Sequence, residues 1–381
     1  MQYFSVVVVG IMTVFAIVGI LDSLFLKDKL GLGAEFRSGI EMIGPLCLAI
    51  VGIISLVPAM KWGIEHTLTP LYAAIGLDPS MAVSTILAID MGGFQLASSV
   101  ALDSTIGQWA GIVYGSMMGA TIVFTIPVGL AAIKKEDVTA FSKGVLYGIA
   151  AIPLGTFVGG LCMGIPLRLV ALNLIPPVIF SVVIIVSLTL WPKQTTSVFR
   201  VFSRIVNGVA MIGLGLAMVR DLILSPLAGS GLFSLDALPV FNMVDSTSEG
   251  IAVAGSVGLV LAGALPFVSC LNRWLRKPLS SLSARFGLTE AGVTGFLLSS
   301  ANNMAMFATM SRMKEREKIV NTAFAVCAAF IIGDHLAFTA ANAPSVIAPM
   351  MLAKAISGGV AVFLAMLFTK NKSTNSATEV K

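Results

Sequence analysis

Apolar runs long enough to cross a membrane recur along nearly the whole chain. No long polar stretch separates them between Val6 and Phe368, and a helix needs roughly 20 apolar residues to cross a bilayer. With 57% hydrophobic and 11% charged residues, the chain cannot cover a soluble surface with polar groups. The sequence therefore predicts an all-α polytopic membrane protein in a lipid bilayer, without a separate soluble domain. The apolar segments are 3–26, 39–60, 80–102, 109–132, 144–165, 170–191, 205–228, 250–272, 288–311, 319–342 and 346–369.

Lysine and arginine form short clusters between these segments. The net charge of +5 could indicate nucleic-acid binding, but basic residues grouped beside spans are typical of cytoplasmic loops, so we expect no nucleic-acid partner. The loop 229–249 contains three carboxylates and no base, which favours the outside. The clusters predicted to be cytoplasmic begin at Lys27, Lys134, Lys193, Arg273, Arg312 and Lys370.

Motifs that would indicate an enzyme or a processed leader are absent from the sequence. There is no G-x-S-x-G, H-E-x-x-H or P-loop, and His66 and His335 are the only histidines. The four cysteines lie inside apolar segments without C-x-x-C spacing. We therefore expect no enzyme, no metal site and no cofactor. The first segment lacks a preceding base and a small-residue cleavage site, so we interpret it as a retained span.

Two segments cannot cross the membrane if the basic loops are cytoplasmic. Segments 80–102 and 109–132 lie between an outside loop and a cytoplasmic cluster, so only one of the two can cross the membrane. Segment 288–311 has cytoplasmic clusters on both sides, so it must begin and end on the same side. Polar or glycine residues at 90–93 and 299–303 interrupt segments 80–102 and 288–311 near their midpoints. Each half then has about 10 residues, and as a helix it would span about half the thickness of the hydrocarbon core. We predict two re-entrant hairpins, 80–102 and 288–311, and about nine transmembrane helices, with the N-terminus outside and the C-terminus inside.

Similar polar residues recur about 200 positions apart. Asp22 and Asp221 end the first span of each half, and Glu41 and Glu249 open the second. The first hairpin would enter from outside and the second from inside, so the two halves form inverted repeats, which are typical of transporters. The predicted organisation is a first inverted repeat at 1–165, a linker span at 166–204, a second inverted repeat at 205–369 and a cytoplasmic tail at 370–381.

Polar residues at the two predicted hairpin tips are candidates for a binding site. A carboxylate at mid-membrane is costly unless a cation or a wet cavity compensates it, so Asp90 could bind a cation or could cap a half-helix. Asn302 and Asn303 could bond a hydroxyl and an ammonium, or could satisfy only their own turn. Gly92 and Gly93 allow close approach of the backbone to a ligand, or serve helix packing.

A second group of candidates lies in the 319–342 span. Asp334 and His335 point about 100° apart on a regular helix, although Gly333 could allow a break. His335, Thr339 and Asn342 form one polar stripe. A buried Asp and His could handle protons or make a structural hydrogen bond. Weaker candidates are Gln95, Ser116, Thr121 and Thr125, and Phe94 directly after the first tip is a further candidate.

Several specific strings lie in or beside the two predicted hairpins and in the segments 109–132 and 319–342. They are Gly76-Leu77-Asp78-Pro79-Ser80-Met81, Asp90-Met91-Gly92-Gly93-Phe94, Gly115-Ser116-Met117-Met118-Gly119, Thr121-Ile122-Val123-Phe124, Ala301-Asn302-Asn303 and Ala323 through Asn342 with Gly333-Asp334-His335. With these strings the chain resembles the ethanolamine utilisation permease family of bacteria, and the likeness covers nearly the whole chain. The resemblance implies uptake of ethanolamine across the bacterial cytoplasmic (inner) membrane, a substrate that composition alone does not indicate.

We therefore expect a transporter that imports ethanolamine by alternating access. Asp90 or Asp334 would pair with the ammonium, and Asn302 or Asn303 would bond the hydroxyl. The alternatives are a channel-like facilitator, a carrier for another small polar cation or metabolite, and a membrane scaffold. The sequence leaves open whether transport is coupled to an ion and whether the protein is a homo-oligomer.

Overall fold

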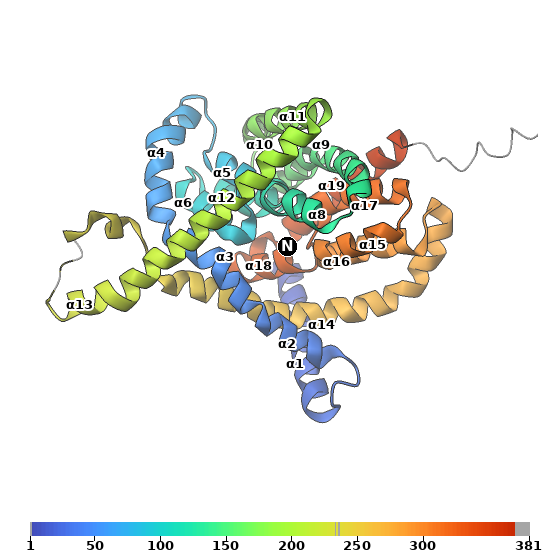
Figure 1. Cartoon of the computed structure of the whole chain (residues 1–381), viewed down its shortest axis with the longest axis horizontal. Coiled ribbons are helices and arrows are strands. Elements are labelled where there is room, and N and C mark those ends of the chain that lie inside the picture. Colours follow the sequence, from blue (N-terminus) through green and yellow to red (C-terminus); the bar gives the residue numbers. More distant parts are fainter. Residues whose placement is uncertain (1, 233, 235–236, 370–381) are drawn as a thin grey trace, which may run out of the picture.

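The computed structural model describes residues 2–369 except 233, 235 and 236, and the described residues form helices and no strands (Figure 1). Eight helical stretches in this part are long and apolar enough to cross a membrane. They overlap eight of the nine predicted crossings, and the ninth, 319–342, is broken into two shorter helices. The predicted tail at 370–381 lies outside the described residues. The eight stretches are Tyr3–Phe25, Leu32–Ser55, Ser104–Ala132, Lys135–Cys162, Leu167–Leu190, Pro192–Gly229, Pro239–Leu275 and Pro344–Phe368.

One group of long helices packs in crossed pairs, α1 on α14 and α12 on α3 (Figure 1). At the first crossing Gly263 lies against the backbone of Met12, and at the second Gly52 lies against the backbone of Ala210. Small residues let helix backbones approach this closely inside a membrane. We call these helices the scaffold: α1 (Gln2–Phe25), α2 (Leu32–Glu41), α3 (Ile43–Ser55), α12 (Pro192–Val219) and α14 (Thr247–Phe286).

A second group, which we call the core, packs around α9, α17 and α19, each in contact with the other two. Gly155 of α9 lies against Ser357 of α19, and Gly144 lies against Thr322 of α17. The core elements are α5 (Ser80–Ile86), η1 (Ile89–Gly93), α6 (Phe94–Val100), α7 (Ser104–Gln108), η2 (Trp109–Gly119), η3 (Thr121–Thr125), α8 (Ile126–Ala132), α9 (Val138–Cys162), α15 (Glu290–Ala301), α16 (Asn303–Thr309), α17 (Glu315–Ala328), α18 (Asp334–Asn342) and α19 (Ile347–Phe368).

The remaining elements connect helices within each group or between the two groups. The predicted linker is α10 and α11, and its boundary at residue 204 lies inside α12, because that helix already begins at Pro192. The connecting elements are α4 (Val57–Ala74), η4 (Lys135–Asp137), α10 (Leu167–Asn173), α11 (Ile175–Leu190), η5 (Arg220–Leu224), α13 (Ser225–Gly229), η7 (Pro239–Met243), η8 (Met310–Arg312) and η9 (Pro344–Val346).

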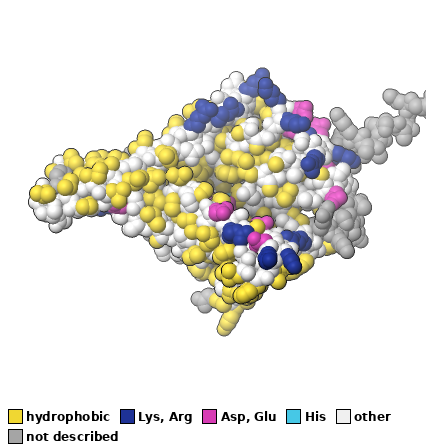
Figure 2. Space-filling view, turned by 60° about the horizontal axis from the view of Figure 1, so that its bottom comes forward, with side chains coloured by type: hydrophobic (Ala, Val, Ile, Leu, Met, Phe, Trp, Pro, Cys, Tyr) yellow, Lys and Arg dark blue, Asp and Glu magenta, His cyan; other side chains and the backbone are white. Residues whose placement is uncertain are grey.

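Hydrophobic side chains cover much of the outer surface, with lysines and arginines gathered in separate groups (Figure 2). Exposed side chains on α11 and α12 include Val182, Val183 and Ile205, each more than half accessible. A surface this apolar is suited to lipid rather than to water.

Each segment predicted as a hairpin consists of two short helices whose outer ends lie side by side. At the ends of the first, the carboxylate of Asp78 accepts hydrogen bonds from the amides of Leu102, at 2.9 Å, and Asp103, at 3.1 Å. At the ends of the second, the buried carboxylate of Glu317 accepts from Thr289 and from the amide of Lys314. Because each carboxylate holds the two ends together, neither segment is an unbroken rod.

The chain between α17 and α18 is unwound and pairs with the tip of the second hairpin. The amide of Phe330 donates to the carbonyl of Ser299 at 3.0 Å, and that of Ile332 donates to Ser300 at 3.1 Å. Gly333 lies so close to the carbonyl of Ala301 that no side chain fits between them. These bonds satisfy backbone groups that a break inside a membrane would otherwise leave unpaired.

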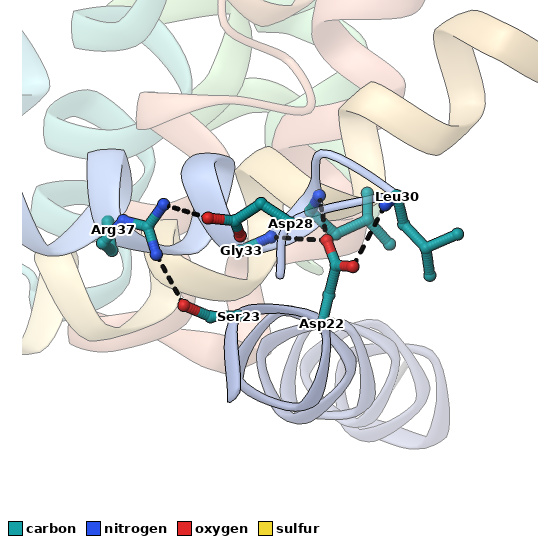
Figure 3. A network of polar contacts seen from close by, with 7 residues as sticks. Asp22, Ser23, Asp28, Leu30, Gly33 and Arg37 are labelled. Carbon is teal, nitrogen blue, oxygen red and sulfur yellow. Dashed lines mark hydrogen bonds and ion pairs between the residues drawn. The ribbon is translucent and has the colours of Figure 1, made fainter. Parts of the chain in front are cut away.

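Asp22, at the end of α1, caps the start of α2 (Figure 3). Its buried carboxylate accepts from the amides of Leu30, Leu32 and Gly33 at 3.1, 2.8 and 3.1 Å. The prediction that Glu41 opens the second span is wrong, because this cap starts the helix at Leu32 and Glu41 is the last residue of α2.

Asp221 makes the corresponding contact in the second half of the chain. Its carboxylate accepts from the amide and the hydroxyl of Thr247, the first residue of α14, both at 2.7 Å. Asp22 and Asp221 thus each cap the start of a later helix, but the prediction that Asp221 ends its span is wrong, because the helical stretch continues to Gly229.

Replacing Asp22 by Ala is expected to destabilise the protein by about 1–3 kcal/mol, because three backbone amides, two of them buried, lose their acceptor. Thermal unfolding in detergent should show a lower Tm. Asp245→Ala removes an exposed carboxylate near α14 and should leave Tm unchanged. Equal Tm values for the two variants would contradict the capping role.

Candidate functional site

The tip of the first hairpin brings Asp90 to the boundary between core and scaffold. The backbone is extended at Leu87 and Ala88, and Asp90 lies in the first turn after that break. Gly92 has a left-handed backbone, with φ of 74°, and any side chain there would collide with Ile53 of α3. The tip is thus seated on the scaffold, with Asp90 partly exposed.

Asp334 is the first residue of α18, directly after the unwound segment. The element η1 contacts α18, and the carboxylates of Asp90 and Asp334 interact electrostatically with each other. Both lie where the chain restarts as a helix, where free amides and the helix dipole favour negative charge. The structure therefore brings together two predicted carboxylates from the two halves of the chain.

A buried lysine that the sequence analysis did not single out lies beside them. The amine of Lys354 on α19 donates to the carbonyl of Ser116 at 2.8 Å and lies 3.1 Å from Nδ1 of His335. Lys354 is fully buried and also interacts electrostatically with Asp90. A lone lysine in the middle of the apolar segment 346–369 was the signal that could have revealed it.

His335 links Lys354 to the unwound segment. Its ring lies 4.9 Å from that of Phe330, measured between centroids. Because Nδ1 faces the Lys354 amine, this nitrogen acts as the acceptor when the amine is protonated.

Several predicted site residues instead bond to the protein itself. Asn303 is completely buried, accepts from the hydroxyl of Ser299 at 2.5 Å and donates to Thr125 at 3.2 Å. Thr121 donates to the carbonyls of Met117 and Val326. Two more predicted residues donate their hydroxyls to their own helix, Ser116 to Val113 and Thr339 to His335.

The remaining predicted residues surround this cluster or lie at its edge. Asn302 caps α16 by accepting from the amide of Met304 at 2.8 Å, and Asn342 donates to Phe338 at the end of α18. The rings of Phe94 and Phe338 meet edge to face at 5.9 Å. The carboxamide oxygen of Gln95 is buried with no hydrogen-bond partner, so it could accept a bond from a ligand or a water molecule. Gly93 donates its amide to Ala88 within the tip.

A cavity of about 500 Å³ lies between the second hairpin and α14. Arg273 and Arg312, from clusters predicted to be cytoplasmic, line it at one end, and Leu298, next to the hairpin tip, lines it at the other. The cavity therefore extends along α15 toward the tip region.

Comparison with known proteins gives the family. A family model described as "Ethanolamine utilisation protein, EutH" matches residues 4–368. The chain belongs to the EutH family. A protein of Listeria monocytogenes named "Probable ethanolamine permease EutH" is 39% identical over 98% of both chains. A protein of Escherichia coli with the same name is 36% identical over 94% of this chain and 90% of its own length. "Uncharacterized protein YxeR" of Bacillus subtilis is 35% identical over 98% of this chain and 97% of its own length. No solved structure matches the chain.

Membership in the EutH family, together with the eight candidate spans, identifies a multi-pass protein of the bacterial inner membrane. In the described part of the chain, no group of three His, Cys, Asp or Glu residues could hold a metal ion, and the four cysteines are unpaired. The groups that the structure gathers near the tips include two carboxylates, one amine, one imidazole and aromatic rings.

Proposed function

We propose that the protein imports ethanolamine across the inner membrane and binds it, as the ammonium form, at Asp90 and Asp334. The observation that carries this proposal is that two carboxylates, from the restarts of two contacting helices, lie near each other, with the buried amine of Lys354 acting on Asp90. With all three groups ionised the cluster has one net negative charge, which suits a single ammonium ion. The names of the Listeria and Escherichia relatives agree with this substrate.

The edge-to-face pair of Phe94 and Phe338 and the unpartnered oxygen of Gln95 add to this proposal. Aromatic faces attract organic ammonium ions, and the Gln95 oxygen could accept a hydrogen bond from the substrate. Asn302, which is partly exposed at the second tip, replaces Asn303 as the candidate for the hydroxyl because Asn303 is enclosed.

Contacts between segment ends support the topology with two re-entrant hairpins. Five of them each join two ends that we predicted on the same side of the membrane. On the cytoplasmic side they are Lys318 with Asp137, Arg273 with Leu30 and Arg316 with Met366, and on the outer side they are Asp78 with Asn173 and Asp245 with Ser55.

The halves are inverted repeats in this proposal. The corresponding caps at Asp22 and Asp221 and the exchanged pairings of α1 with α14 and α12 with α3 support that symmetry. The core would move against the scaffold during alternating access, and the cavity beside α15 would be the cytoplasmic release route.

Uptake of radiolabelled ethanolamine by the purified protein in liposomes tests the proposed function. We expect saturable uptake that excess unlabelled ethanolamine inhibits. A channel-like facilitator would instead bring the ammonium ion only to equilibrium with the membrane potential, and no imposed ion gradient would raise uptake above that level. Absence of uptake beyond protein-free liposomes, with correctly inserted protein, would reject ethanolamine transport.

A further inference from the structure

Lys354 places a positive charge deep inside the core without a carboxylate in direct contact. Among the lysines and arginines whose side chains the structure describes, it alone is buried. Its amine contacts the carbonyl of Ser116 and Nδ1 of His335, and it makes no direct ion pair with a described residue. A buried ammonium needs a counter-charge, because neutral acceptors replace only part of its hydration.

The acid that interacts electrostatically with Lys354 at the hairpin tips is Asp90. The other ionisable groups around the amine are His335, which accepts from it, and the thiol of Cys327 on α17. Asp334 interacts with Asp90. Asp90 is therefore the carboxylate on which both the fixed cation and the proposed ammonium of the substrate would act.

The amine is also anchored to both halves of the core. Ser116 belongs to η2, where Gly115 and Gly119 face the carbonyl of Leu87 in the first hairpin, and His335 belongs to α18, beside the break that pairs with the second hairpin. A change at either hairpin would thus alter how closely the amine approaches Asp90.

We propose that Lys354 is a tethered cation that neutralises Asp90 while the site is empty and is displaced from it electrostatically by the ammonium of the substrate. This inference rests on the proposed function. Its consequence concerns the return step of transport, in which the empty protein must change conformation with the charge of Asp90 compensated. Without Lys354 a second unbalanced carboxylate would move with the empty site through the membrane interior, and that raises the barrier.

The test compares net uptake with exchange for Lys354→Gln in liposomes. Net uptake of labelled ethanolamine into empty liposomes requires the empty protein to return, whereas exchange in liposomes preloaded with unlabelled ethanolamine does not. We expect net uptake to fall at least about tenfold and exchange to stay within about twofold of wild type, because only the empty state loses its compensating charge. The matched control Lys193→Gln, at an exposed lysine, should change neither rate.

Equal loss of both rates, or no change in either, would overturn the role of Lys354. If the wild-type protein shows neither net uptake nor exchange, the proposed ethanolamine transport is rejected. If the wild type transports and only the comparison with Lys354→Gln fails, the role of Lys354 alone is rejected. If Lys354→Gln does not fold, the double variant Asp90→Asn with Lys354→Gln decides. If Lys354 compensates Asp90, removing both charges should restore folding and bring the Tm back toward the wild-type value. Continued misfolding of the double variant would reject this charge compensation.

Discussion

Asp90→Asn is expected to abolish saturable ethanolamine uptake while leaving membrane insertion intact. The substitution keeps the size of the side chain and removes the charge that would pair with the ammonium. Removing one partner of a desolvated charge pair costs about 2 kcal/mol or more, which is at least about thirtyfold in affinity. Uptake at substrate concentrations well below saturation should fall by that factor or more.

The control for Asp90→Asn is Asp245→Asn, which removes an exposed carboxylate outside the site. Yield, detergent-solubilised size and Tm of both variants show whether the protein still folds. Retained saturable uptake by Asp90→Asn, with unchanged half-saturation, would remove Asp90 from the site.

Gly333→Ala is expected to damage both stability and transport. A Cβ at this position would meet the carbonyl of Ala301 at the second hairpin tip, closer than real side chains approach a backbone oxygen. The tip and the unwound segment would have to separate, weakening the bonds from Phe330 and Ile332. Overpacking of this kind costs about 1–3 kcal/mol. Because Asp334 follows directly, the site would also lose its geometry.

The Tm and the uptake rate of Gly333→Ala should therefore both fall below the wild-type values. Gly359→Ala is the matched control, since that helical glycine has nothing within 4 Å of the added carbon. It should leave transport unchanged and keep or slightly raise Tm, because alanine favours helix. The same behaviour in both variants would contradict the close contact at Gly333.

The sequence predicted the spans and the positions of the breaks well, because both depend on local patterns. Apolar length marked eight stretches that the structure contains as helices. Charge parity and the polar breaks at Asp90 and Asn302 indicated two interrupted segments, and in the structure Asp78 and Glu317 each join the two ends of a broken segment. That these segments are re-entrant in the membrane stays a prediction. Neither carboxylate was singled out from the sequence.

The site was harder to predict because its contacts join distant positions. Asn303 was a candidate ligand, but it bonds Thr125, 178 positions away, and is enclosed. Lys354 was overlooked, since its partner Ser116 is 238 positions away and lysines elsewhere in the chain lie in basic loops. A residue pattern gives the depth of a polar group in the membrane, whereas its partners depend on the packing of helices far apart in the sequence.

Single-cysteine labelling in a cysteine-free background tests most directly whether the two hairpins enter the membrane from opposite faces. Cysteines at Ala74 and Ser104 flank the first hairpin, and cysteines at Glu290 and Ser311 report on the ends of the second. We expect a membrane-impermeant maleimide added to intact cells to label the first pair, and to reach the second pair only after permeabilisation. Labelling of Ala74 and Ser104, or of Glu290 and Ser311, from opposite sides would show a full crossing and contradict the proposed site at the hairpin tips.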